Sequence, residues 1–157
     1  MLANTGATDG NNVKDRQLED LVREAIERYA TLRIWDHMLQ IQADDGLVTL
    51  TGHVRTAPSK ETAERIVRQV PGVRAIDNRL LIDTDLEIAV GRALAENAVT
   101  ASSFPGILIG SAFGEIHLKG HVASPEIRQA AEQIAGQVPG VRAVKNELFA
   151  PEPPAGT

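Results

Sequence analysis

The chain has 157 residues, of which 43% are apolar and 24% charged, with a formal net charge of −5 and no cysteine. A negative net charge argues against a general nucleic-acid binder, which needs a basic excess to displace counterions from phosphate. Without cysteine, the sequence predicts no disulfide, no thiolate metal site, no cysteine nucleophile and no cysteine-linked lipid anchor. No run approaches the roughly 18 apolar residues of a membrane span, so we expect a protein that is not transmembrane.

The two ends of the sequence differ in composition from the rest. Residues 1–14 lack the basic start and apolar core of a secretory signal, and residues 151–157 are rich in proline. We therefore expect disordered tails at residues 1–14 and 151–157. For the sequence as given we also expect a cytoplasmic location; a chain trimmed at its N-terminus would instead belong to the periplasm or envelope.

The heptapeptide QVPGVRA occurs twice, at residues 69–75 and 137–143. The same offset aligns Gly52-His53-Val54 with Gly120-His121-Val122 without a gap. This internal duplication predicts two structural units, at residues 15–82 and 83–150, with no linker between them. Units of about 65 residues are near the lower limit for an independent core, so we expect the two copies to support each other.

Each unit begins with apolar residues at helical spacing. In the first copy the predicted buried face comprises Leu18, Leu21, Val22, Ala25, Ile26 and Tyr29. In the second copy Thr84-Asp85-Leu86-Glu87 has the form of a capping box, which predicts that the helix starts there.

The remaining elements follow in the same order in both copies. Alternating apolar residues predict a hairpin, closed at Asp45-Gly46 in the first copy and at Phe113-Gly114 in the second. A second helical pattern then ends at a Pro-Gly pair, where glycine accepts the left-handed conformation, and a third strand follows. The glycine that follows the second strand of each copy is also expected to be structural. The residues with an expected structural role in these turns are Gly52, Gly120, Pro71, Gly72, Pro139 and Gly140.

The order helix, strand, strand, helix, strand resembles the BON domain family. The motifs that carry the resemblance are VTLTGHV at residues 48–54, Pro71-Gly72-Val73 and Asn78-x-Leu80. The resemblance covers both copies and implies an α+β fold of two tandem αββαβ units, each a small three-stranded mixed sheet covered by two helices. It also implies a transport-associated or osmotically inducible bacterial protein, for which phospholipid contact is the usual proposal, and one member of the family senses potassium.

Basic residues are concentrated in the first copy. Residues 15–82 contain ten Lys or Arg against eleven Asp or Glu, and residues 83–150 contain five against eight. A surface for an anionic ligand is therefore expected in the first copy. Its candidate residues are Arg55, Lys60, Arg65, Arg68 and Arg74.

An aromatic residue lies in the first helix-to-strand connection of each copy. These residues are Trp35, the only tryptophan, and Phe104. Such an aromatic either covers the edge of a small core or enters a lipid interface or a partner groove. Both interpretations are open from the sequence.

Residues of catalytic or metal-binding type form no recognisable motif. His53 and His121 are equivalent, and His117 precedes His121 by four, but Thr49 stands at the position of His117 in the first copy. A transition metal needs three or four ligands in defined geometry. No nucleophile elbow, phosphate loop or dinucleotide fingerprint is present. We therefore predict no catalytic residue, no metal and no cofactor.

Asn78 and Asn146 occupy equivalent strand positions whose parity matches apolar neighbours such as Leu80 and Leu148. A side chain on that face needs hydrogen-bond partners, so we expect each amide to bond backbone groups of the turn or helix end at the Pro-Gly pair. A β-bulge that turns the asparagine outwards is the alternative.

The residues and the resemblance together predict a non-enzymatic tandem binding module. One hypothesis is an adaptor at an anionic phospholipid surface or in the envelope. A second is an intracellular sensor of a monovalent cation such as potassium, and a third is a scaffold that binds other proteins. The oligomeric state stays open.

Overall fold

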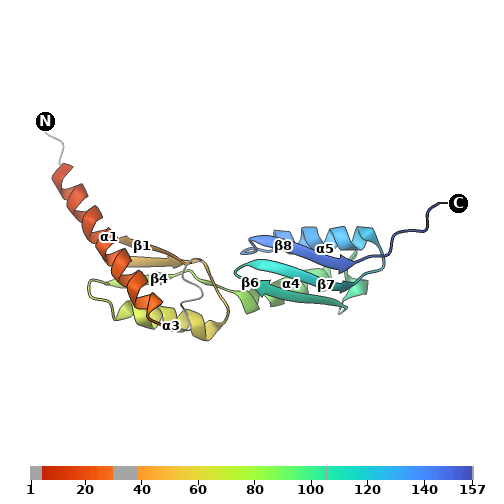
Figure 1. Ribbon diagram of the computed structural model, residues 1–157, viewed down its shortest axis with the longest axis horizontal. Helices are drawn as coiled ribbons and strands as arrows, with labels where there is room; N and C mark the ends of the chain where they lie inside the picture. The colour runs from red at the N-terminus through yellow and green to blue at the C-terminus, as the bar shows by residue number, and fades with distance from the viewer. Residues whose placement is uncertain (1–4, 30–38, 105, 157) are drawn as a thin grey trace. The chain divides into compact units, whose positions relative to one another are not determined.

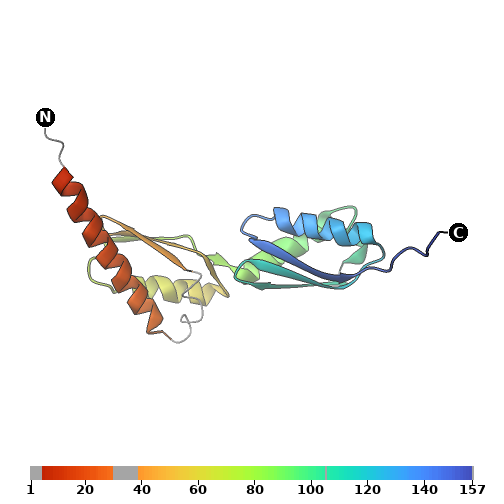
Figure 2. The ribbon, with the colours of Figure 1, turned by 45° about the horizontal axis from the view of Figure 1, so that its top comes forward.

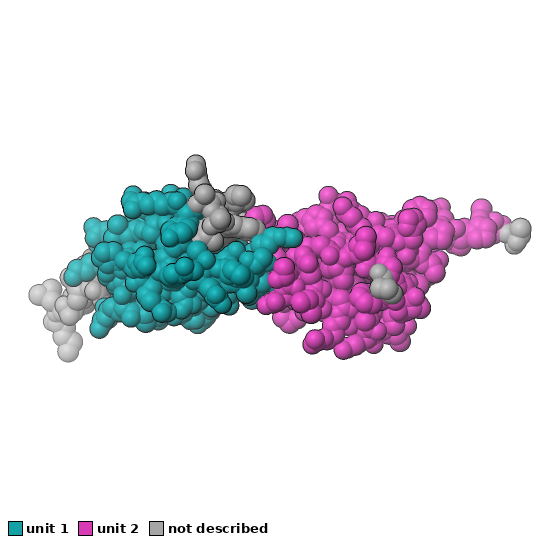
Figure 3. All heavy atoms as spheres, turned by 90° about the horizontal axis from the view of Figure 1, so that it is seen from below, with its two compact units in different colours: residues 1–82 teal, residues 83–157 magenta. Residues whose placement is uncertain are grey.

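The computed structural model describes residues 5–29, 39–104 and 106–156. The chain divides into two compact units, residues 1–82 and 83–157 (Figure 3). Each unit has its own hydrophobic core, formed between its helices and one face of its sheet.

Unit 1 contains a three-stranded mixed sheet. Strands β1 (Gln40–Asp44) and β2 (Leu47–Thr51) are antiparallel, and β4 (Ala75–Asn78) joins β2 in parallel, which gives the order β1-β2-β4. The short strands β3 (His53–Val54) and β5 (Leu81–Ile82) continue the parallel pairing beyond Gly52. Helices α1 (Thr5–Glu27) and α3 (Ala57–Arg68) lie on one face of this sheet (Figure 1).

Unit 2 repeats the arrangement. Helices α4 (Asp83–Glu96) and α5 (Pro125–Gln137) cover one face of a sheet formed by β6 (Ile107–Ala112), β7 (Glu115–His121) and β8 (Ala143–Phe149) (Figure 2). A short 3-10 helix, η2 (Ala101–Ser103), follows α4. β6 pairs with β7 antiparallel and β8 pairs with β7 in parallel. The predicted α+β fold of two αββαβ units is confirmed.

The first helices differ from the prediction at their N-termini. α1 begins at Thr5 and includes residues 5–14, which were predicted to be a disordered tail. α4 begins at Asp83, one residue before Thr84, and the Glu87 carboxylate accepts hydrogen bonds from Ser111 on the sheet. The predicted capping box is therefore wrong, because Glu87 serves the sheet and not the helix start.

Leu21 and Tyr29 were predicted to lie on the buried face of the first helix, but the structure places both outside the core. Their exposed fractions are 47% and 50%, whereas Leu18, Val22 and Ile26 are buried. The equivalent residues of unit 2 are Ala89 and Asn97. The core of this fold therefore needs no large apolar side chain at either position.

Glycine conformations explain the repeated turns. Asp45 and Gly46, like Phe113 and Gly114, have positive φ angles, which is the geometry of a two-residue type I′ hairpin turn. At Gly120, with φ +129°, an added Cβ would lie 2.3 Å from the carbonyl oxygen of Gly106, so no larger residue fits. Gly72 and Gly140 have φ angles of 98° and 93°. Each lies in a turn that follows the helix and is closed by a backbone bond, from Val73 N–H to the Val70 carbonyl at 3.3 Å and from Val141 N–H to the Val138 carbonyl at 3.1 Å.

The arginine of the repeated heptapeptide returns to the hairpin turn. The backbone N–H of Arg74 donates to the carbonyl of Gly46, and that of Arg142 donates to Gly114, each at 2.8 Å. In unit 1 the Arg74 side chain also packs over Gly46. QVPGVRA thus ends a helix and then fixes the start of the last strand against the hairpin.

Carboxylates of the first helix bond the amides of the hairpin in both units. Asp83 Oδ2 and Oδ1 accept from the N–H groups of Phe113 and Gly114 at 2.8 and 2.9 Å, and Asp15 accepts from Asp45 at 3.1 Å. One helical turn later, Glu87 accepts from Ser111 N–H at 3.0 Å and the equivalent Glu19 accepts from Ala43 N–H at 2.9 Å. We call these residues the carboxylate ladder: Asp15 and Glu19 in unit 1, Asp83 and Glu87 in unit 2.

Asn78 and Asn146 connect the last strand to the second helix. Asn78 Nδ2 donates to the Lys60 carbonyl at 3.1 Å and to Glu64 Oε2 at 3.3 Å. Asn146 Nδ2 donates to the Arg128 carbonyl at 2.9 Å and to Glu132 Oε2 at 3.1 Å. Both amides face the helices and bond backbone, as predicted, but the partners lie near the start of the helix and not at the Pro-Gly end, because the strand runs back alongside the whole helix.

We predict that Asn146→Leu destabilises unit 2 by at least about 1 kcal/mol, because the helix carbonyl and the glutamate lose their donor. The same change at Asn78 has the same effect on unit 1. Denaturant melts measure the free energy of unfolding. Lys145→Leu is the matched control, since Lys145 is exposed on the other face of β8. Unchanged midpoints in both asparagine variants would contradict the prediction.

The carboxylate ladder yields a second prediction. Asp83 is fully buried and accepts two amides, so Asp83→Ala removes two charge-assisted bonds and costs about 2–3 kcal/mol. Asp15→Ala removes one exposed bond and costs less than about 1 kcal/mol. Amide hydrogen exchange reports the local effect, with faster exchange expected at Phe113 and Gly114. Equal losses in the two variants would show that burial of Asp83 does not matter.

Candidate functional site

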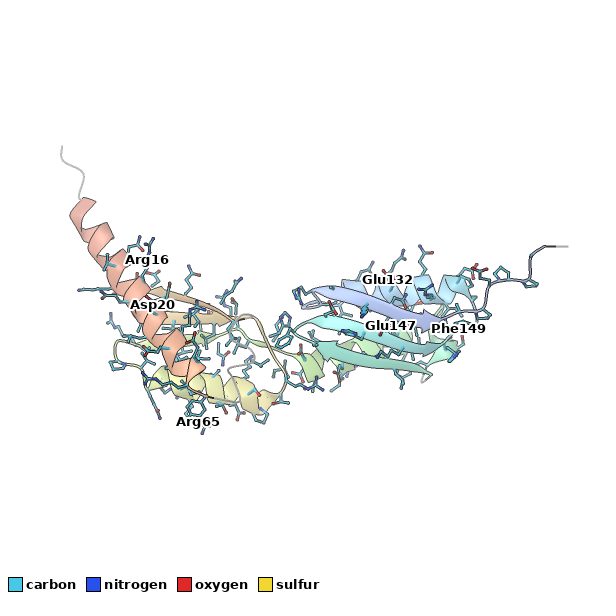
Figure 4. The ribbon with its side chains drawn as sticks, viewed as in Figure 1. Arg16, Asp20, Arg65, Glu132, Glu147 and Phe149 are labelled. Carbon is cyan, nitrogen blue, oxygen red and sulfur yellow. The ribbon has the colours of Figure 1, made fainter. Side chains whose placement is uncertain are left out.

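The five basic residues predicted to form an anionic-ligand surface lie on α3 and at its two ends. Lys60, Arg65 and Arg68 belong to α3, Arg55 precedes the helix and Arg74 follows it. Figure 4 labels Arg65 on α3. The Thr56 side chain caps the helix by accepting from Ser59 N–H, which fixes where the first basic residues stand.

Acidic residues form ion pairs with two of these five basic residues. Arg68 Nη2 lies 2.7 Å from Glu64 Oε1, and Arg74 Nη1 lies 3.6 Å from Asp45 Oδ2. Arg65 donates to the Thr62 hydroxyl at 3.4 Å, with no carboxylate within ion-pair distance among the described residues. These pairs are exposed, so each contributes little stability, but each offsets a positive charge. Lys60 forms no such ion pair among the described residues either, so Arg65 and Lys60 are the two basic side chains of α3 whose charge is not offset by a paired carboxylate.

A groove runs between α1 and α3 on the helical face of unit 1. Its volume is about 290 Å³, and its walls comprise Leu21, Glu24, Ala25, Arg28, Tyr29, Ile66, Gln69, Val70 and Pro71. Arg65 lies one helical turn before Gln69, on the same side of α3. We call this surface, with Arg65, the α1–α3 groove.

The α1–α3 groove combines apolar walls with charged rims. Leu21 and Tyr29 are half-exposed at its opening, while Arg28 pairs with Glu24 at 3.0 Å. Helical spacing assigned Leu21 and Tyr29 to the core, so this groove was not predicted from the sequence. Alignment of the two copies could have shown that these two positions are not core positions, since Ala89 and Asn97 replace Leu21 and Tyr29 in unit 2.

The two candidate interface aromatics have different outcomes. Trp35 lies outside the described residues. Phe104 is half-buried and packs against the core of unit 2, where its ring lies near Gly91. Phe104 therefore covers a core edge, which is the first of the two interpretations given for the pair.

The histidines of β7 lie on the face of the sheet that the helices leave open. His117 Nε2 is 2.9 Å from Glu115 Oε1, and its Nδ1 is 4.0 Å from Glu147 Oε2. His121 packs against Phe149, with ring centroids 5.3 Å apart. Figure 4 labels Glu147 and Phe149 on β8. Among the described residues, no group of three or more histidine, aspartate or glutamate side chains is arranged to hold a metal ion.

The geometry defines a class of protein with two tandem αββαβ domains and, in unit 1, a shallow groove between the helices. The family model for the BON domain matches residues 14–84 and 82–149. The chain therefore belongs to the BON domain family, as its repeated motifs predicted. Along the described parts of the chain, no helix is both long and apolar enough to cross a bilayer.

Two relatives match most of the chain. One is Osmotically-inducible protein Y of Escherichia coli (strain K12), which is 26% identical over 150 residues, or 88% of this chain and 74% of the relative. The other is Outer membrane lipoprotein DolP of Haemophilus influenzae, which is 26% identical over 149 residues, or 87% of this chain and 75% of the relative. A relative described as an outer membrane lipoprotein does not support the cytoplasmic location predicted from the N-terminal sequence.

A solved structure shares the fold. The C-terminal domain of CdsD, a structural protein of the type III secretion system of Chlamydia trachomatis, aligns with a TM-score of 0.68 and 17% identity. The alignment covers 88% of this chain and 67% of that chain. At this level of identity the likeness establishes the fold alone.

Proposed function

We propose that this protein is a non-enzymatic tandem BON binding protein of the bacterial envelope, and that unit 1 contacts anionic lipid through the α1–α3 groove. The observation that carries the proposal is that half-exposed Leu21 and Tyr29 line one groove together with Arg28. Arg65 lies one helical turn before Gln69, which lines the same groove. Apolar and tyrosine side chains enter the interfacial region of a bilayer, while arginines meet the headgroup phosphates. The similarity to Outer membrane lipoprotein DolP supports an envelope location.

Electrostatics limit the strength of this contact. Each basic residue near an anionic surface contributes about 1 kcal/mol, and the attraction falls off within a Debye length. Glu64 offsets the charge of Arg68, and the whole chain carries a net charge of −5. A reversible, salt-sensitive association is therefore the expected behaviour, with Arg65 contributing more than Arg68.

Co-sedimentation with vesicles tests the proposal. We predict retention on vesicles that contain phosphatidylglycerol, with less retention on pure phosphatidylcholine. Arg65→Glu should lower partitioning by at least about tenfold, since it removes one favourable charge and adds an unfavourable one. Tyr29→Ser should weaken retention on the same vesicles without changing its salt dependence.

Charge reversal in unit 2 provides the control. Arg128 is exposed on α5 at the position equivalent to Lys60, so Arg128→Glu changes the net charge by the same amount away from the groove. Equal losses for Arg65→Glu and Arg128→Glu would attribute retention to net charge alone. Equal retention on both lipids, or none on either, would refute the lipid proposal.

The monovalent-cation sensor stays a prediction from the family resemblance. A backbone-carbonyl site leaves almost no side-chain signature, so a direct measurement is needed. The measurement is a series of thermal unfolding midpoints in potassium chloride and in sodium chloride at equal ionic strength. A potassium-specific rise in the unfolding midpoint would favour the sensor.

A further inference from the structure

We propose that two copies of this chain pair through β6, antiparallel and about a two-fold axis at Ile109, to join their unit 2 sheets. β6 is an edge strand in the order β6-β7-β8. Its sequence, ILIGSA, contains no charged residue and no proline, the two devices that commonly blunt an edge strand. Such an edge is a template for strand addition.

The carboxylate ladder stops short of the middle of β6. The Asp83 carboxylate accepts hydrogen bonds from the N–H groups of Phe113 and Gly114, and the Glu87 carboxylate accepts one from the N–H of Ser111. One helical turn after Glu87 the residue of α4 is Gly91, where an added Cβ would lie 3.4 Å from Ile109 Cδ1. The helix therefore offers no side chain to the backbone of Ile109.

Alternation fixes the direction of the backbone groups of Ile109. Ser111 N–H points out of the sheet towards Glu87, so the N–H and C=O of Ile109, two residues away, point to the same outer side. In an antiparallel pair, directly opposed residues alternate between hydrogen-bonded pairs, which exchange both N–H···O bonds, and non-hydrogen-bonded pairs. A two-fold axis at Ile109 lets a second copy satisfy both groups with its own Ile109.

The side chains on the open face are complementary in the same register. Pairing Ile109 with Ile109 places Leu108 of one copy opposite Gly110 of the other, twice by symmetry. Leu108 is 67% exposed, and a Cβ added at Gly110 meets nothing within 4 Å. Each leucine thus covers the space that the partner's glycine leaves empty.

The helix side of the edge is also open and carries complementary charge. A hollow of about 440 Å³ there comprises Glu87, Ile88, Gly91, Arg92, Ala95, Phe104 and Ile109. Glu87 and Arg92 lie on opposite sides of Gly91 along α4. A two-fold axis beside Gly91 therefore places the Arg92 of each copy on the side of the other copy's Glu87.

The equivalent edge of unit 1 is protected by its sequence. β1 presents Gln40, Gln42 and Asp44 where β6 presents Leu108, Gly110 and Ala112. On α1, Arg23 is the residue equivalent to Gly91, one helical turn after Glu19. Of these two equivalent edges, β1 is polar and β6 is apolar, so β6 is the one that fits a second copy of itself.

Sedimentation equilibrium of the full chain without lipid tests the proposal. Few hydrogen bonds and a small area predict a weak dimer, so concentrations from about 10 µM to about 1 mM are needed. The weight-average mass should rise from 16.9 kDa towards twice that value. Leu108→Lys and Gly91→Arg, which copies unit 1, should hold the mass at the monomer value.

Gln40→Lys is the matched control, because it places the same charge at the equivalent position of β1 and should leave the dimer intact. Far-UV circular dichroism checks that each variant is folded. A monomer at every concentration would overturn the proposal, as would a dimer insensitive to both β6 variants. If the chain is monomeric but β6 variants lose binding to a different protein, a foreign strand is the occupant and the second copy is excluded.

The absence of native cysteine permits a test of register. Leu108→Cys and Gly110→Cys are made separately and mixed under oxidising conditions. Directly opposed residues of a non-hydrogen-bonded pair have the spacing of a disulfide, so the mixture should cross-link more than either variant alone. Equal cross-linking in all three samples would overturn the Ile109-centred register.

Discussion

The anchoring of the first helix to the hairpin by the carboxylate ladder is the constraint on which each domain depends. A sheet of three short strands has edge amides that need partners, and a domain of about 70 residues has little core to compensate for unpaired ones. Asp83 and Glu87 supply acceptors from the helix that also provides the apolar layer. Asn146 then ties the last strand to the second helix, so every element of the unit is connected by a polar bond as well as by packing.

The two copies differ most clearly in sequence at positions where the fold does not depend on the side chain. The buried positions and the turn glycines are repeated, whereas Leu21 against Ala89, and Arg23 against Gly91, are not. The first difference opens an apolar groove on the helices of unit 1, and the second uncovers a strand edge in unit 2. The two copies thus differ in these surfaces while their cores are built at equivalent positions.

Periodicity and the 68-residue repeat were sufficient to predict the element order and the hairpins. Side-chain partners were predicted less well, because they depend on which elements lie side by side. Asn146 was expected to bond the nearby turn but bonds the start of α5, and Glu87 was expected to cap its own helix but bonds Ser111. The basic cluster was visible in the sequence, while the pairing of Arg68 with Glu64 required the fold.

Phe113 gives one further consequence of the hairpin geometry. A phenylalanine with φ 53° carries backbone strain of about 1–2 kcal/mol, and the buried Asp83 carboxylate that holds its amide offsets that strain. The order in which substitutions accumulate at this turn therefore matters. A lineage that first replaces Phe113 by asparagine, which accepts the left-handed conformation readily, starts from a higher stability when it afterwards loses Asp83. A lineage that loses Asp83 first keeps a strained turn without its acceptor, so the two positions are expected to change in a preferred sequence.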